Sequence, residues 1–240
     1  YNGASLYADI GDTTMEEAHL NQYLDDMQWQ QLNYDIRENG IKQDVKGHPY
    51  QTSLFGNKAA EFIETNKENR FFLYAAFNAP HAPIQAPKKY YDELSHIENH
   101  SQRVYYAMIK SLDDAVGTIT KKLQELGLEE NTIIYFTSDN GGASYTKLMD
   151  NTPFKGGKIT HFEGGQVVPF CMQWKGRIPP QQVFEKSISL MDIFTTSAVA
   201  AQAELPKKKI DGVNIQALIQ GNTEAEPRKV FYYYYRKNNC

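Results

Sequence analysis

Two apolar runs near the middle of the chain, each closed by a polar turn, are the clearest structural pattern in the sequence. Residues 71–77 read Phe-Phe-Leu-Tyr-Ala-Ala-Phe, and Asn78 and Pro80 end the run. Residues 132–137 form the second run, which ends at Ser138-Asp139-Asn140-Gly141-Gly142. Runs that are apolar on both faces are typical of interior strands in a parallel sheet. We therefore predict two buried strands here.

The segment between these runs predicts a long helix. Apolar side chains recur every three or four positions from Tyr105 to Leu126, and Gly127 follows as a helix-ending residue. Strand, helix and strand in this order suggest a right-handed crossover, and hence an α/β fold. Further predicted elements are a short helix around Ala59–Ile63, a third strand within 167–174, a helix over 190–201, and an aromatic strand over 230–235. Residues 1–50 are polar and weakly periodic, which predicts loops.

Composition narrows the class of protein. The 240 residues carry 25 Lys and Arg against 29 Asp and Glu, a net charge of −4, which excludes a strongly basic nucleic-acid binder. From this charge we expect no nucleic-acid partner. No apolar run approaches the roughly 18 to 20 residues that cross a bilayer, so we also expect no membrane span. Cys171 lies in an apolar run and predicts a buried thiol, while Cys240 ends the chain. A disulfide framework is therefore not expected.

Both predicted strands lead into loops that could carry chemistry. His81 stands between Pro80 and Pro83, although an isolated histidine is more often structural than catalytic. Asp139 and Asn140 pair a carboxylate with an amide carbonyl beside two glycines, which is a ligand set for Ca²⁺ or Mg²⁺. A simple Asx turn closing the strand explains the same residues equally well.

A third candidate segment, residues 154–165, places two glycine pairs around Lys158, His161 and Glu163. This composition suits a loop that holds a cationic side chain against an anion. A plain surface loop is the alternative. Taken together, the three loops supply a possible metal pair, a lysine and a histidine, which are the groups that a site for an anionic ester requires.

These motifs, in this order, resemble the type I sulfatases of the alkaline phosphatase superfamily. The resemblance covers about Tyr50 to Tyr235 and implies a mixed, largely parallel sheet flanked by helices, with a small C-terminal antiparallel subdomain. The matching segments are Ala79-Pro80-His81-Ala82-Pro83, Ser138-Asp139-Asn140-Gly141-Gly142, Gly156-Gly157-Lys158, Glu163-Gly164-Gly165, the helical stretch 111–117 and Leu190-Met191-Asp192-Ile193.

The resemblance also implies roles for individual residues. Asp139 and Asn140 would bind one divalent cation, Ca²⁺ rather than Mg²⁺. Lys158 would contact the sulfate oxygens, and His81 would lie near the leaving-group oxygen, so these two are the expected catalytic residues. His161 would line the substrate pocket. The implied substrate is a sulfated small molecule or a sulfated glycan.

One motif of that family has no counterpart in these 240 residues. Type I sulfatases form a formylglycine nucleophile within a Cys/Ser-x-Pro/Ala-x-Arg motif, and no such motif occurs here. We therefore expect residues 1–225 to be part of a catalytic domain whose N-terminal, nucleophile-bearing part lies outside the chain, and 226–240 to begin the C-terminal subdomain. The missing part would be the partner of this chain, which should be inactive alone. No signal peptide is visible, although the resemblance favours a periplasmic or secreted protein.

Three functions are consistent with this sequence. The first is hydrolysis of sulfate esters. The second is a phosphodiesterase or phosphonate monoester hydrolase of the same superfamily, because the same loops can hold phosphoryl oxygens. The third is a metal-dependent binding protein that keeps the site and lacks the nucleophile.

Overall fold

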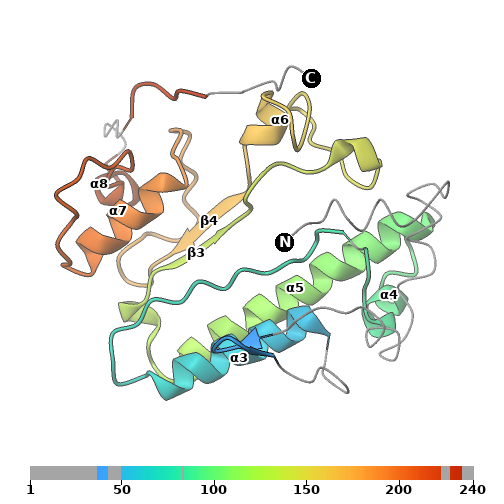
Figure 1. Ribbon diagram of the computed structural model, residues 1–240, viewed down its shortest axis with the longest axis horizontal. Coiled ribbons are helices and arrows are strands. Elements are labelled where there is room, and N and C mark those ends of the chain that lie inside the picture. Colours follow the sequence, from blue (N-terminus) through green and yellow to red (C-terminus); the bar gives the residue numbers. More distant parts are fainter. Residues whose placement is uncertain (1–36, 43–49, 83, 223–227, 234–240) are drawn as a thin grey trace. The chain divides into compact units, whose positions relative to one another are not determined.

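The computed structural model describes residues 37–42, 50–82, 84–222 and 228–233. The chain divides into two compact units. The first contains residues 1–126 and 146–149, and the second contains residues 127–145 and 150–240. Figure 1 labels most of the helices and strands of both units.

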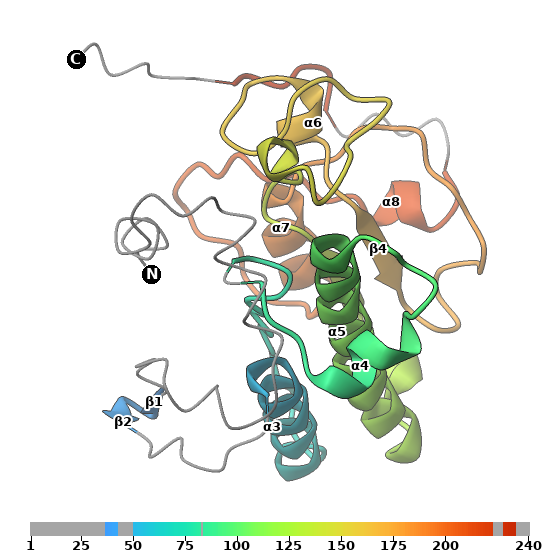
Figure 2. The ribbon, with the colours of Figure 1, turned by 90° about the vertical axis from the view of Figure 1, so that its right-hand side faces the viewer.

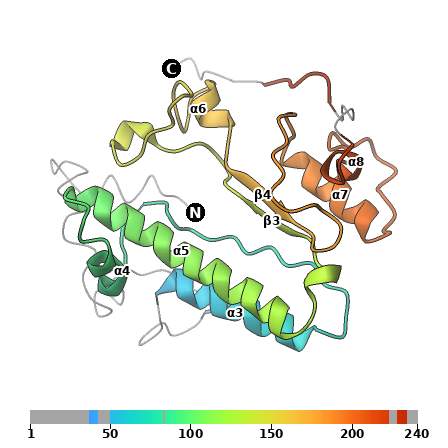
Figure 3. The same cartoon turned by 180° about the vertical axis from the view of Figure 1, so that it is seen from behind.

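In the described residues of the first unit there are three helices, α3 (Gln51–Thr65), α4 (Lys88–Glu93) and α5 (His100–Glu125). Helices α3 and α5 lie side by side (Figure 3). They meet closely at Gly56, where a Cβ atom would lie only 2.9 Å from the Cβ of Ala115. An ion pair between Glu64 and Lys122, 3.1 Å long, links the two helices further along. Short side chains at the crossing thus allow the close contact.

Helix α5 confirms the predicted long helix and begins five residues earlier than its apolar pattern. The side chain of Asn99 caps it by accepting a hydrogen bond from the Gln102 amide at 3.0 Å. Gly127, with φ at 66°, follows its end as predicted. Although α5 has 26 residues, no helix in the described part of the chain is both long and apolar enough to cross a membrane.

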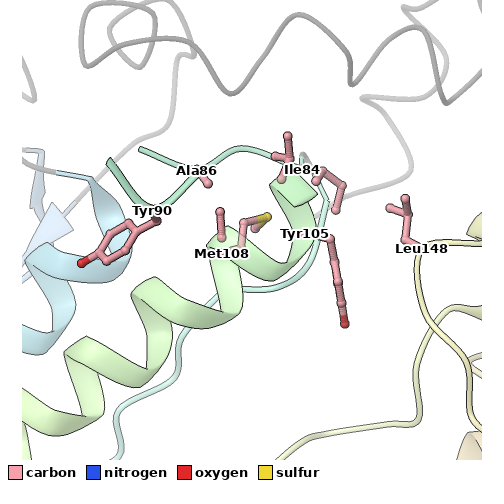
Figure 4. Packing of buried hydrophobic residues seen from close by; sticks show 8 residues of the cluster. Ile84, Ala86, Tyr90, Tyr105, Met108 and Leu148 are labelled. Carbon is pink, nitrogen blue, oxygen red and sulfur yellow. The ribbon is translucent and has the colours of Figure 1, made fainter. Parts of the chain in front are cut away.

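The apolar face of α5 forms one side of the core of the first unit. Tyr90 of α4 belongs to the buried cluster that forms this core, and α4 packs against α5 (Figure 2). The loop before α4 is anchored by Tyr50, whose hydroxyl donates to the carbonyl of Gln85 at 2.8 Å. Burial raises the pKa of Tyr50. The buried cluster in Figure 4 comprises Ile84, Ala86, Tyr90, Val104, Tyr105, Ala107, Met108 and Leu148.

A short hairpin lies within the region predicted to be loops. Strand β1 (Arg37–Glu38) pairs antiparallel with β2 (Ile41–Lys42). Asn39 and Gly40 connect them with φ of 52° and 81°, the left-handed geometry of a type I′ turn that Asn-Gly favours. The prediction of loops is therefore wrong for residues 37–42, while residues 1–36 and 43–49 lie outside the described part.

The second unit contains the antiparallel pair β3 (Ile134–Thr137) and β4 (Phe170–Gln173). Both strands fall within predicted runs, and their register places Phe136 opposite Cys171. Helix α7 (Met191–Ala200) confirms the helix predicted over 190–201. It contacts β3 through a hydrogen bond of 3.2 Å from the hydroxyl of Ser197 to that of Tyr135. Four further short elements lie in the described residues: η2 (Glu129–Asn131), η3 (Ser144–Thr146), whose last residue belongs to the first unit, α6 (Glu163–Gln166) and α8 (Gln216–Ile219).

The α/β class is confirmed, but the strand arrangement differs from the prediction. In the described residues the strands form only two-stranded antiparallel sheets. Residues 71–77 contain no strand, and neither do residues 230–233 of the predicted aromatic strand, whose end lies outside the described part. A strand needs a neighbouring backbone to complete its hydrogen-bond ladder, and an apolar run by itself cannot supply one. The proposed crossover is therefore not observed.

Cys171 is exposed, contrary to the prediction of a buried thiol. Side chains alternate between the two faces of a strand, and Cys171 shares its face with Phe136, which is 41% exposed. Tyr135 points to the other face, where it meets α7. The apolar run around Cys171 therefore does not indicate that its thiol is buried, because only one face of this two-stranded sheet is covered within the described residues.

Candidate active site

The candidate site begins where β3 ends. The hydroxyl of Ser138 donates to the carbonyl of Asn140 at 2.9 Å, and the side-chain amide of Asn140 donates to the carbonyl of Gly141 at 3.0 Å. Asp139 is exposed, and within the described residues its carboxylate has no hydrogen bond or ion pair. A compact turn thus holds one carboxylate and one amide carbonyl at the strand end, an oxygen pair that suits a hard cation.

The loop that carries Lys158 is joined directly to this strand end. The backbone amide of Lys158 donates to the carbonyl of Gly142 at 3.0 Å. A tight turn follows, in which the amide of Thr160 donates to the carbonyl of Gly157 at 3.0 Å. Ile159 occupies this turn with φ at 66°. The structure therefore brings the loop of Lys158 into contact with the strand end of Asp139 and Asn140, while the roles of these residues stay predictions.

Glycine is required where the loops of this assembly touch. The amide of Gly141 donates to the carbonyl of Gly165 at 3.1 Å. A Cβ atom on Gly141 would lie 1.8 Å from the carbonyl oxygen of Gly164, and one on Gly164 would lie 2.3 Å from that of Gly156. Any side chain at Gly141 or Gly164 would force the backbones apart. The glycine pairs of these loops thus allow the backbones to approach each other closely.

Asn151 belongs to the same assembly and was not singled out from the sequence. Its Oδ1 accepts from the amide of Gly142 at 3.0 Å. Its Nδ2 donates to the carbonyls of Gly142 at 2.9 Å and Gly156 at 3.0 Å. The sequence contained only a weak signal, an asparagine two residues before Pro153 in a polar loop. Its partners are recognisable only in the folded chain.

The aromatic side chain of Phe162 organises the outer part of this loop. The ring of His161 lies 4.5 Å from that of Phe162, with an angle of 36° between the planes. The Lys155 ammonium lies 4.4 Å from the centre of the same ring, a cation–π contact. The role of His161 as pocket lining stays a prediction. The contact of Lys155 with this ring makes it a useful control for Lys158.

His81 belongs to the first unit. It is exposed, its Nδ1 lies 2.8 Å from the carbonyl oxygen of Ala82, and the peptide bond between Ala79 and Pro80 is cis. Its approach to Lys158 and Asp139, which belong to the second unit, stays a prediction. Among the described residues no three His, Cys, Asp or Glu side chains form a group that could hold a metal. Asp139 and Asn140 fit a metal only as two ligands of a larger shell.

Comparison with known proteins identifies the family. The family model described as Sulfatase matches residues 7–203. The chain belongs to the sulfatase family. This sulfatase chain is 37% identical over 194 residues to N-acetylgalactosamine-6-sulfatase of Rattus norvegicus, a match that covers 78% of the chain and 36% of that relative. It is 35% identical over 206 residues to an arylsulfatase of Hemicentrotus pulcherrimus, covering 82% of the chain and 36% of that relative.

The solved structures that resemble this sulfatase chain include Ps i-CgsB in complex with k-i-k-neocarrahexaose. That match has a TM-score of 0.74 and 32% identity, and covers 84% of this chain and 47% of the solved one. The chain spans about a third of the length of the two relatives described above, since each match covers 36% of the relative. The family membership agrees with the resemblance inferred from the sequence motifs.

Proposed function

We propose that this chain contributes part of an active site that hydrolyses sulfate monoesters. The observation that carries the proposal is the hydrogen bond from the Lys158 amide to the Gly142 carbonyl, 3.0 Å long, beside Asp139 and Asn140. It couples a loop bearing an ammonium group to a strand end bearing two oxygen ligands. A sulfate monoester is an anion whose leaving oxygen gains charge during cleavage, and fixed positive groups stabilise that charge.

The residues of this chain would have distinct tasks in that reaction. Asp139 and Asn140 would hold a divalent cation, for which Ca²⁺ is proposed because it accepts a mixed shell of carboxylate, amide and water oxygens. When bound, such a cation supplies positive charge to the sulfate oxygens. Lys158 would bind and orient the sulfate group. His81 would lie at the leaving-group oxygen and hold or donate a proton there, and the formylglycine nucleophile would come from outside these 240 residues.

The proposed substrate is a sulfated saccharide. The name of the rat relative, N-acetylgalactosamine-6-sulfatase, and the neocarrahexaose in the Ps i-CgsB complex both support it. Two exposed aromatic side chains of the second unit, Tyr145 in η3 and Phe154 in the loop before Lys158, could stack on sugar rings. We also propose that residues 71–77 join a largely parallel sheet in the complete catalytic domain, which requires strands beyond those described.

A comparison of two lysines in one loop tests the proposed function. In the complete enzyme, Lys158→Ala should lower kcat/KM for a chromogenic aryl sulfate by roughly 100-fold, because a preorganised charge opposite the developing anion is lost. Asp139→Ala should abolish stimulation by Ca²⁺. Lys155→Ala is the matched control and should change kcat/KM by less than about 3-fold, since Lys155 contacts Phe162. Equal effects of the two lysine substitutions would contradict the proposal.

A further inference from the structure

We propose that Asn151 is the positioning residue that holds the Lys158 loop against the strand end carrying Asp139 and Asn140. This inference rests on the proposed function for its catalytic consequence. The structural basis is the side chain of Asn151, which makes three hydrogen bonds of 2.9–3.0 Å, every one to the backbone of the two loops. Asn151 itself does not need to touch the substrate.

The hydrogen bonds of Asn151 allow only one orientation of its amide. Nδ2 faces two carbonyl oxygens, those of Gly142 and Gly156, while Oδ1 faces the amide of Gly142. Turning the amide over would place oxygen against two carbonyls and nitrogen against an N–H group. Both hydrogens of Nδ2 are therefore used, one on each loop. The side chain acts as a fixed two-way link between the loops.

Gly142 is the point at which this link reaches Lys158. Its carbonyl accepts from the amides of Ser144 at 2.9 Å and Lys158 at 3.0 Å, and also from the Nδ2 of Asn151. Asn151 binds both the N–H and the carbonyl of this one residue, so it restricts the peptide groups on either side of Gly142. The same restriction sets the direction of the hydrogen bond to Lys158.

Asn151 also acts on the other side of the Lys158 loop. Its bond to the carbonyl of Gly156 lies two residues before Lys158, and Gly156 has φ at 78°. Lys158 is thus held from both directions, by Asn151 at Gly156 and by the strand end at Gly142. Displacing a charged group by about 1 Å can lower a catalytic rate roughly 100-fold, so a link of this kind matters for an anion-binding lysine.

The decisive kinetic experiment is a double-mutant cycle in the complete enzyme. Asn151→Ala should lower kcat for an aryl sulfate at least 10-fold with KM changed by less than about 3-fold, as expected for lost positioning. In the Lys158→Ala background the same substitution should lower kcat by less than about 3-fold, because its target is gone. An equal loss in both backgrounds would overturn the proposal. Asn214→Ala is the matched control, since Asn214 also accepts a backbone amide, that of Gln216 at 3.0 Å, away from this assembly.

A second measurement needs no variant and no turnover. In the unsubstituted protein, the amides of Gly142 and Lys158 should exchange with solvent much more slowly than those of neighbouring loop residues, because both are hydrogen-bonded within the assembly. Rapid exchange of both amides would overturn the role of Asn151, even if Asn151→Ala fails to fold. If Lys158→Ala leaves kcat unchanged while the amides are protected, the proposed function fails and the structural link stands.

Discussion

Ile159 is a residue in an unfavourable backbone conformation beside Lys158. Its φ of 66° lies in the left-handed region, and its side chain is 75% exposed. A β-branched residue rarely adopts this region, because its Cβ substituents crowd the backbone, at a cost of about 1–3 kcal/mol. Apolar contacts do not offset this cost when the side chain is so exposed. The strain is maintained by the tight turn from Gly157 to Thr160.

Replacing Ile159 by asparagine should therefore stabilise the protein. Asparagine tolerates positive φ, so Ile159→Asn should raise the free energy of unfolding by about 1 kcal/mol, measured by urea denaturation. Val183→Asn is the control, because Val183 is also exposed, at 88%, and has no positive φ. The control should shift the unfolding free energy by no more than about 0.5 kcal/mol. A destabilised Ile159→Asn would show that the isoleucine side chain makes a favourable contact that outweighs the strain.

At the scale of elements, α7 is fixed to a distant segment by a buried ion pair. The carboxylate of Asp192 is buried and accepts from Arg228 at 2.7 Å and from the amide of Val213 at 2.9 Å. Arg228 also donates to the carbonyl of Asp211 at 2.8 Å. Asp192 thus joins the start of α7 to two segments that follow it in the chain.

Removing Arg228 should be strongly destabilising. Arg228→Met leaves the buried Asp192 carboxylate without its countercharge, and should lower the free energy of unfolding by about 3–5 kcal/mol. Urea denaturation gives the value. Lys88→Met provides the comparison, because it breaks an exposed ion pair with Asp92 and should cost less than about 1 kcal/mol. Similar losses for the two substitutions would mean that the buried ion pair between Asp192 and Arg228 does not hold α7 in place.

The contact between α3 and α5 should respond to acid. Two hydrogen bonds lower the pKa of Glu64, the larger effect coming from Lys67 and the smaller from Lys122. A carboxyl group whose pKa is lower in the folded state stabilises the fold above its unfolded pKa, and this contribution disappears as the pH falls through the folded pKa. Glu64→Gln should therefore flatten the loss of stability below about pH 4. An NMR titration of Glu64 with an ordinary midpoint would contradict this expectation.

At the scale of the whole molecule, the 240 residues alone should not hydrolyse sulfate esters. They contain no Cys/Ser-x-Pro/Ala-x-Arg motif, so no residue can supply the expected aldehyde nucleophile. Asp139 and Asn140 provide two oxygens of a shell that Ca²⁺ fills with about six to eight, so calorimetry should find only weak Ca²⁺ binding. The assay is hydrolysis of an aryl sulfate with Ca²⁺ present. Turnover that Lys158→Ala removes would place the nucleophile within this chain.

The sequence by itself determined the elements whose signals are local. The three-and-four spacing and Gly127 identified α5, and short apolar runs identified β3, β4 and α7. It also located the loops that carry Asp139, Asn140, Lys158 and the glycine pairs, and the order of these motifs resembles that of the sulfatase family. Each element and each motif depends on residues near one another in the chain, where periodicity and turn chemistry act.

Only the tertiary structure decided which of these pieces meet. It paired β3 with β4 antiparallel, left residues 71–77 without a strand, and exposed Cys171. It also revealed the link through Asn151 and the contact of Asp192 with Arg228, 36 positions away. The physical reason is that ladder bonds, side-chain links and burial depend on the backbone that lies opposite, and an apolar or polar pattern along the chain does not specify that neighbour.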